Sequence, residues 1–246
     1  MKTSHSIYQD GNHRWLAIVR DPERAGHLID TNEFLVESGG DSLLCDPGGI
    51  EIFPAVFSAL CAEADPTAIR GIFASHQDPD IISSLALWLD FNPALKCYTS
   101  WLWATFLPHF GGTADTFVSI PDEGMPIPLG ALDLRAIPAH YLHSSGNHHL
   151  YDPKARILFS GDVGAALLPP ERNGLFVEDF DSHIRFAEGF HRRWMGSNAA
   201  KMAWCERVAA LEIDMLCPQH GAIYQGADVG RFIQWFADLD VGRLRE

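Results

Sequence analysis

Short apolar runs alternate with turn-forming residues and with stretches of helical periodicity along the whole chain. This mixture of the two periods predicts an α/β protein in which strands and helices alternate. Apolar runs predict strands in a hairpin over residues 7–19 and at residues 32–37, 42–45, 69–74, 94–99, 132–137, 158–162 and 216–217. Apolar side chains at helical spacing predict helices over residues 52–63, 81–89, 183–194, 199–211 and 232–239.

A group of polar residues interrupts this pattern between the strand at 69–74 and the helix at 81–89. His76, Asp78 and Asp80 place one imidazole and two carboxylates at the end of a buried strand. Burying these groups is costly unless a cation compensates them, so a metal site is one interpretation. The alternative is a polar turn in which Asp80 caps the helix and His76 lies at the surface.

Three later strands also end in residues of the kind that bind metals. His143 follows the strand at 132–137, Asp162 ends its own strand, and His220 follows a short apolar run. A rigid scaffold can hold such side chains while short loops expose them. The recurrence of this arrangement favours one shared metal site, with His140 as an alternative to His143.

Other features of the sequence limit the partners and the compartment. The formal charge of −14 argues against nucleic acid and anionic membranes as partners. Five cysteines without paired spacing indicate a reducing compartment. An apolar N-terminal signal and a run approaching about 20 apolar residues are both missing, so we expect a cytoplasmic protein.

Two further segments have a structural interpretation. Residues 121–128 are rich in Pro and Gly, and we expect them to form the seam between two βα halves of a single domain over residues 1–246. The halves belong together because residues from both must meet at the metal site. Trp101, Trp103 and Phe106 predict core packing or, alternatively, a hydrophobic roof over that site.

The order of these motifs resembles the metallo-β-lactamase superfamily over nearly the whole chain, from Asn32 to Gly221. The resemblance is strongest to the diiron branch, the flavodiiron proteins and their stand-alone oxygen-binding relatives. Zinc hydrolases of this superfamily carry His-x-His-x-Asp-His, whereas this chain has Asp78 and Ile81 in place of the second and last His. Flavodiiron proteins carry Glu at the position of Asp78. The implied fold is an αββα sandwich, an α/β architecture.

The resemblance also implies a dinuclear metal site. The implied ligands are His76, Asp78 and His143 for one metal, Asp80 and His220 for the other, and Asp162 as the bridge. Carboxylates with imidazoles suit two iron ions, with zinc and manganese as alternatives. Ile81 cannot bind a metal, which leaves room for an exogenous ligand at the second ion. Asp46, at a strand end, either accepts a hydrogen bond from a ligand imidazole or is a turn residue, and the resemblance favours the former.

We therefore expect a diiron protein that binds or senses dioxygen. Flavodiiron proteins reduce oxygen or nitric oxide with electrons from a flavodoxin domain, for which this chain has no room after its last motif, so reduction would need an external donor. The alternative is a hydrolase that attacks a thioester, lactone or phosphodiester with metal-bound hydroxide. The expected partners are dioxygen or another small molecule, a redox or signalling protein, and a second copy in a homodimer. Whether the chain is an enzyme stays open.

Overall fold

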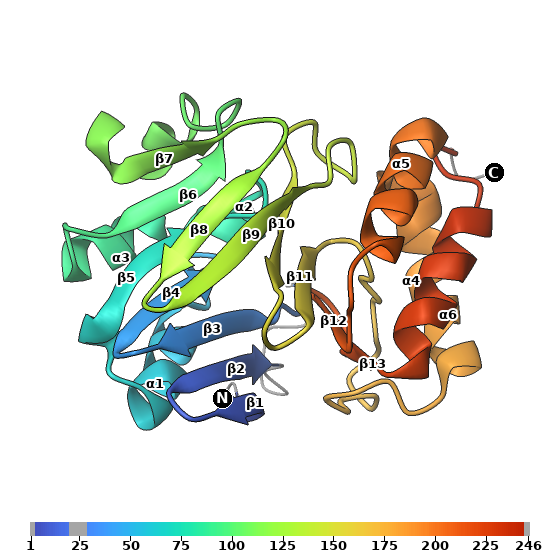
Figure 1. Ribbon diagram of the computed structural model, residues 1–246, viewed down its shortest axis with the longest axis horizontal. Helices are drawn as coiled ribbons and strands as arrows, with labels where there is room; N and C mark the ends of the chain where they lie inside the picture. Colours follow the sequence, from blue (N-terminus) through green and yellow to red (C-terminus); the bar gives the residue numbers. More distant parts are fainter. Residues whose placement is uncertain (1–2, 20–28, 244–246) are drawn as a thin grey trace.

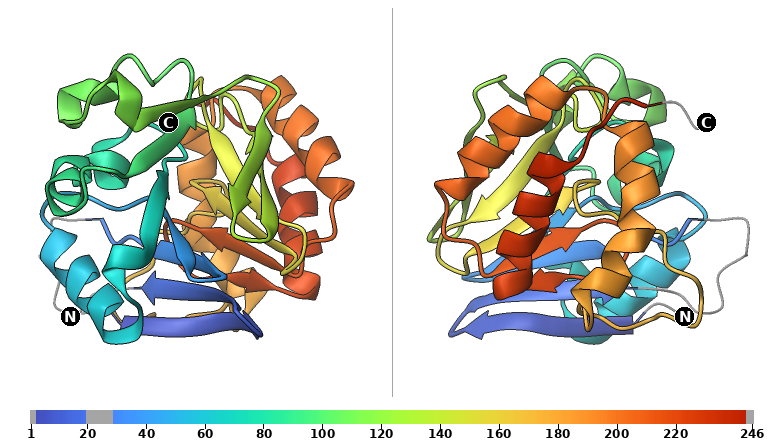
Figure 2. Two further views of the ribbon diagram at one scale, coloured as in Figure 1. Left: turned by 60° about the vertical axis from the view of Figure 1, so that its left-hand side comes forward. Right: turned by 90° about the vertical axis from the view of Figure 1, so that its right-hand side faces the viewer.

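Two β-sheets lie face to face in the computed structural model, which describes residues 3–19 and 29–243. Helices α1 and α3 lie outside the first sheet, and α4, α5 and α6 lie outside the second (Figure 1). Figure 2 shows the four layers from two further sides. The order of the layers is therefore αββα, as predicted.

The first sheet has seven strands in sequence order. They are β1 (Thr3–Asp10), β2 (His13–Val19), β3 (Glu33–Ser38), β4 (Asp41–Cys45), β5 (Ile69–Phe73), β6 (Lys96–Ser100) and β7 (Phe117–Ile120). The strands from β1 to β4 pair antiparallel, and those from β4 to β7 pair parallel. The predicted hairpin is thus confirmed as β1 and β2, while β7 was not predicted.

The second sheet has six strands in the order β13, β12, β11, β10, β9, β8. They are β8 (Met125–Leu129), β9 (Leu132–Pro138), β10 (His148–Asp152), β11 (Ile157–Gly161), β12 (Met215–Pro218) and β13 (Tyr224–Gln225). Among the described strands of this sheet, β11 and β12 pair parallel and all other neighbours pair antiparallel. Residues 121–124 connect the last strand of the first sheet with the first strand of the second.

Helices cover the outer faces of both sheets. The α-helices are α1 (Phe53–Glu63), α2 (Pro79–Ile82), α3 (Leu85–Phe91), α4 (Phe180–Trp194), α5 (Asn198–Ala209) and α6 (Ala227–Asp238). The short 3-10 helices are η1 (Pro66–Ala68), η2 (Leu107–Phe110) and η3 (Ala114–Thr116). None of the described helices has both the length and the apolar character that crossing a membrane requires.

The sandwich buries both faces of its central strands, which explains their continuous apolar runs. In β2, Trp15 and Ala17 point into the core between the sheets, whereas Leu16 and Ile18 pack beneath the helices of the first sheet. Phe34 and Phe159 meet across the two sheets, with ring centroids 5.5 Å apart. The buried core therefore has three layers, which fixes the strand ends firmly enough to position a site.

Several elements differ in detail from those predicted. The helix expected over residues 81–89 is divided into α2 and α3 at Ser83 and Ser84. The break arises because the backbone nitrogen and the hydroxyl of Ser84 both bond to the carbonyl of Gly48 instead of continuing the helix. Residues 125–129 form β8, a strand that the sequence did not predict. It lies at the edge of its sheet, where the exposed Pro126 and Pro128 can lack a backbone N–H without breaking the hydrogen bonds of a central strand.

Candidate metal centre

The structure brings all six residues predicted as ligands to one place. Each lies just beyond the end of a strand or at the start of a helix. His76 follows β5, Asp78 directly precedes α2, and Asp80 lies in the first turn of α2. His143 lies in the loop between β9 and β10, and Asp162 and His220 follow β11 and β12. The backbone nitrogen of His148 bonds to the carbonyl of Ser75, so the loops of the two sheets are joined here.

Four of the six residues form one cluster. His143 Nε2 lies 3.0 Å from Asp162 Oδ2 and 3.2 Å from Asp78 Oδ2. His76 Nε2 lies 3.5 Å from Asp162 Oδ2 and 3.7 Å from Asp78 Oδ2. All four donor atoms lie within 4.8 Å of one another, which is close enough for one ion to contact each of them.

The other oxygen of Asp162 faces a second, smaller group. His220 Nε2 lies 3.3 Å from Asp162 Oδ1 and 3.5 Å from Asp80 Oδ2. Asp162 therefore turns one carboxylate oxygen to each side. This is the geometry of a carboxylate that can bridge two ions.

Burial and charge at this place fit a metal. Asp162 and His76 are almost completely buried, and Asp162 Oδ1 and His76 Nε2 have no hydrogen-bond partner in the described part of the chain. Burial lowers the pKa of His143 and His220, but the nearby Asp162 outweighs it and raises both to about 9. The carboxylates therefore stabilise positive charge here, and divalent cations can replace the protons. Asp78 and Asp80 are 26% and 28% exposed, so this side of the site opens to solvent.

The far sides of two imidazoles are held by hydrogen bonds that fix their tautomers. His220 Nδ1 donates to the carbonyl of Asp30 at 2.7 Å, which leaves Nε2 free as a donor atom for a metal. His76 Nδ1 lies 2.9 Å from the hydroxyl of Ser75, which itself donates to Asp46. His76 Nδ1 must therefore donate to that hydroxyl, and its Nε2 is free as well.

Asp46 does not contact an imidazole directly, contrary to one sequence interpretation. It accepts hydrogen bonds from the backbone nitrogen of Ser75 at 2.7 Å and from the Ser75 hydroxyl at 2.6 Å. Burial raises the pKa of Asp46 to about 7 against the opposing charge of His76. Its effect on His76 thus passes through one intervening hydroxyl.

Of the histidines near His143 in the sequence, His140 and His149 have hydrogen-bond partners away from the six candidate ligands. His140 Nε2 bonds to the carbonyl of Asp122 at 2.8 Å, away from the six residues, so His143 and not His140 joins them. His149 accepts a hydrogen bond from the indole of Trp204, and burial lowers its pKa to about 3. Ile81 is fully buried in the core beneath the helices of the first sheet.

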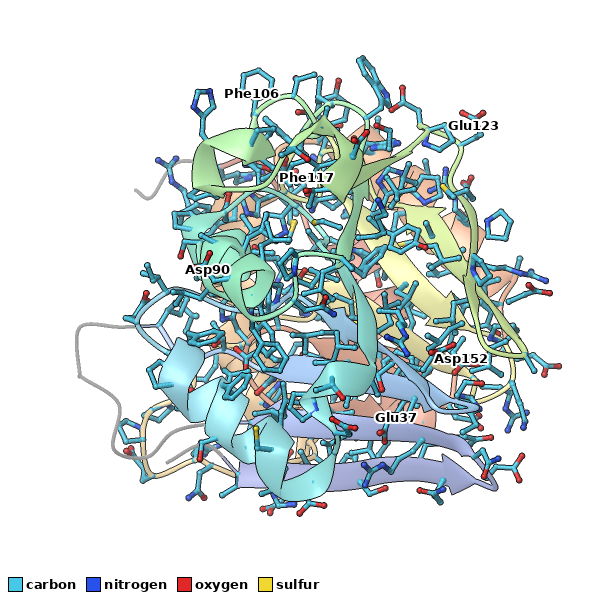
Figure 3. All side chains as sticks on the ribbon, turned by 90° about the vertical axis from the view of Figure 1, so that its left-hand side faces the viewer. Glu37, Asp90, Phe106, Phe117, Glu123 and Asp152 are labelled. Atoms are coloured by element: carbon cyan, nitrogen blue, oxygen red, sulfur yellow. The ribbon has the colours of Figure 1, made fainter. Side chains whose placement is uncertain are left out.

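Helix α4 supplies aromatic contacts that the sequence did not reveal. The ring of Trp194 lies 5.4 Å from that of His143, and the ring of Phe190 lies 6.3 Å from that of His220. Phe190 and Trp194 stack on each other at 5.7 Å. The aromatic cluster considered as a roof does not act as one group. Trp103 packs against the core beneath the helices of the first sheet, whereas Trp101 and Phe106 are half exposed and Phe106 lies at the outer edge of the molecule (Figure 3).

Comparison with known proteins places this geometry in a family. A family model described as "ODP family beta lactamase" matches residues 29–221. The chain belongs to the ODP family. No curated protein matches it. This family match and the solved structures described next confirm the predicted metallo-β-lactamase-type sandwich and the resemblance to its diiron branch.

Solved structures agree with membership of the ODP family. Two are of the chemotaxis sensor ODP, one a peroxy diiron species and one the apo state from T. denticola. Each is 38% identical and covers 98% of this chain and 96% of its own, with TM-scores of 0.85 and 0.89. A variant of the flavo di-iron protein from Thermotoga maritima is 22% identical, with a TM-score of 0.83, and covers 96% of this chain but 61% of its own. At that identity the likeness concerns the fold alone.

Proposed function

We propose that this chain is a non-haem diiron protein that binds dioxygen and signals its presence. The observation that carries the proposal is Asp162, which directs one carboxylate oxygen toward His76 and His143 and the other toward His220. A buried carboxylate between two groups of donor atoms is the requirement for a dinuclear centre. The 38% identity with a chemotaxis sensor whose diiron species has been solved supports the same conclusion.

In this proposal each metal has its own terminal ligands. The first ion is held by His76, Asp78 and His143, the second by Asp80 and His220, and both by Asp162. Ferrous ions at these positions would supply the electrons that dioxygen binding requires. The residues' own part is to hold the ions a fixed distance apart and to leave the second one with fewer protein ligands.

The donor set favours iron over a zinc hydrolase centre. Three carboxylates and three imidazoles make a harder and more anionic set than the imidazole-rich sites of zinc hydrolases. Added negative charge stabilises the oxidised state of a redox metal. It also makes metal-bound water less acidic and thus a poorer source of hydroxide near neutral pH.

The signalling part of the proposal concerns a partner protein. A sensor must pass the state of its metal site to another molecule, and the similar ODP structures are described as a chemotaxis sensor. We propose that dioxygen is the small-molecule ligand and that a signalling protein is the partner. The alternative partner is a second copy of this chain, bound in a homodimer.

Exposure of the ferrous protein to oxygen tests the proposal. The protein is purified without oxygen, loaded with ferrous iron, and mixed with oxygenated buffer while its visible spectrum is followed. We expect a charge-transfer band to develop within seconds, and none in the metal-free protein or in Asp162→Ala. A lack of spectral change with iron, together with rapid hydrolysis of a thioester, lactone or phosphodiester by the zinc or manganese form, would replace the oxygen-binding proposal by a hydrolase.

A further inference from the structure

The side chain of Gln77 connects two loops of the candidate metal centre. Its Nε2 donates to Asp78 Oδ1 at 2.9 Å, and its Oε1 accepts from the Ser144 hydroxyl at 2.6 Å. Asp78 precedes α2, whereas Ser144 directly follows His143 in the loop between β9 and β10. One amide therefore joins segments that are 67 residues apart in the sequence.

Only an amide in this orientation satisfies both contacts. An ionised carboxylate only accepts hydrogen bonds, so the nitrogen of Gln77 must face Asp78 and its oxygen must face Ser144. The Ser144 hydroxyl is then obliged to donate. A carboxylate at position 77 could not donate to Asp78, and an apolar side chain could make neither bond.

The amide decides which oxygen of Asp78 faces the centre. Because Oδ1 is occupied by Gln77, Asp78 presents Oδ2 to His143 at 3.2 Å and to His76 at 3.7 Å. On the other side, the Ser144 bond fixes the residue that follows His143, and the amide of Asn147 bonds to the carbonyl of Leu142 within the same loop. Two donors of the first cluster are thus set in place from one side chain.

We infer that Gln77 is the positioning residue of the first metal site and couples that site to the loop over residues 142–147. The inference rests on the proposed function, because it assumes that Asp78 and His143 bind the same ion. Among the described residues we find no such coupling in the second cluster, where the nearby Gln219 bonds to the backbone carbonyl of Asp80 and not to its carboxylate. A change at Gln77 should therefore weaken the first ion alone.

The test is a titration of the full chain with manganous ion, in which free ion is followed by its electron paramagnetic resonance signal. In Gln77→Met we expect the affinity of one of two ions to fall about 10- to 100-fold, the usual effect of removing a partner of a metal ligand. Ser144→Ala removes one of the two hydrogen bonds, so its affinity for that ion should fall by a smaller factor. In Gln77→Glu the affinity for that ion should fall at least as far as in Gln77→Met, because the new carboxylate repels the carboxylate of Asp78.

A background variant assigns the effect to the first site. In His220→Ala, where we expect the first ion to remain, adding Gln77→Met should lower the affinity for that remaining ion about 10- to 100-fold. The matched control is Gln234→Met, which deletes an exposed amide bonded to Asp238 Oδ2 at 3.0 Å on α6 and should bind both ions normally. In metal-free Gln77→Met, backbone amides of residues 142–147 should exchange with deuterium faster than in the parent protein.

Each remaining outcome decides against some part of this account. If the parent protein binds two ions and Gln77→Met and Ser144→Ala bind both with unchanged affinity, the inference about Gln77 is wrong while the diiron proposal stands. Equal loss of both ions would make Gln77 a general structural residue and would equally overturn the inference. If the parent protein binds fewer than two ions, the proposed function itself fails.

Discussion

Asp162 is the residue on which the proposed centre depends most. Its carboxylate lies among three imidazoles, and although burial raises its pKa, the nearby rings of His143, His220 and His76 hold the pKa well below the usual range. A carboxylate that stays ionised while buried is ready to bind cations. No other described residue faces both groups of donor atoms with both of its oxygens.

Replacing Asp162 should therefore remove more metal than replacing His220. We expect Asp162→Ala to lose both ions, because both share this ligand, and His220→Ala to lose mainly the second. Elemental analysis of iron per chain after anaerobic loading measures the difference, expected near zero in the first variant and near one in the second. Full occupancy in Asp162→Ala would remove the bridging assignment.

At the residue scale the sequence predicted the position of the centre but not its supporting contacts. The meeting of the six side chains could be predicted because each lies beyond a strand or at the start of a helix and has a distinctive neighbour, such as Gly161 before Asp162. The link from Asp46 through Ser75 was missed, because hydrogen bonds between side chains distant in sequence leave no periodic pattern. Gln77 was overlooked for the same reason, and Trp194 on α4 was predicted only as part of a helix.

At the scale of elements, α4 is attached to the segment that carries Asp162. His191 accepts a hydrogen bond from the backbone nitrogen of Gly164 at its Nε2 and donates from Nδ1 to the carbonyl of Ala187. Acceptance of the hydrogen bond from Gly164 requires the neutral ring, and burial lowers the pKa of His191 to about 4. Protonation would break the bond to Gly164.

This arrangement predicts acid sensitivity with a definite sign. The folded pKa of His191 lies below the ordinary value of 6.5, so its contribution to stability is present above pH 6.5 and is lost as the pH falls toward 4. In that range the unfolded chain binds one more proton than the folded chain. The free energy of unfolding therefore falls by about 1.4 kcal/mol for each pH unit of acidification. Urea denaturation of the metal-free protein should show this slope reduced in His191→Gln. The exposed His109→Gln serves as control, and equal slopes in all three proteins would contradict the prediction.

Strands and helices were predictable where one period dominates and both flanks carry turn residues. The hairpin of β1 and β2 and the amphipathic helix α4 follow this rule. The pattern failed for β8, because prolines usually exclude a strand, yet an edge position tolerates them. It also failed between α2 and α3, where the serine hydroxyl of Ser84 bonds to a distant carbonyl that no local pattern indicates.

At the scale of the whole molecule, the centre joins the two sheets. His76 follows a strand of the first sheet, whereas His143, Asp162 and His220 follow strands of the second. A core of side chains from both sheets lies between them. We propose that the two halves fold as one domain, because neither could bury its inner face or complete the centre alone.

A single domain should unfold in one transition. We expect circular dichroism and tryptophan fluorescence to give the same midpoint, and bound metal to raise it. With free ion at about 1,000 times the dissociation constant, one site adds about 4 kcal/mol. For a chain of this size that corresponds to an increase in Tm on the order of 10 °C. Two separate transitions would show that the halves are independent.

Anomalous diffraction from crystals of the anaerobic, iron-loaded protein tests the central claim most directly. Data collected on either side of the iron absorption edge locate iron without assuming any ligand. We expect two iron peaks in the anomalous difference map, about 3.5–4 Å apart, which is the usual spacing of two-metal sites, with the carboxylate of Asp162 between them. His76 and His143 should contact one peak, and His220 the other. A single peak, or two peaks with Asp162 turned away from either, would contradict the central claim.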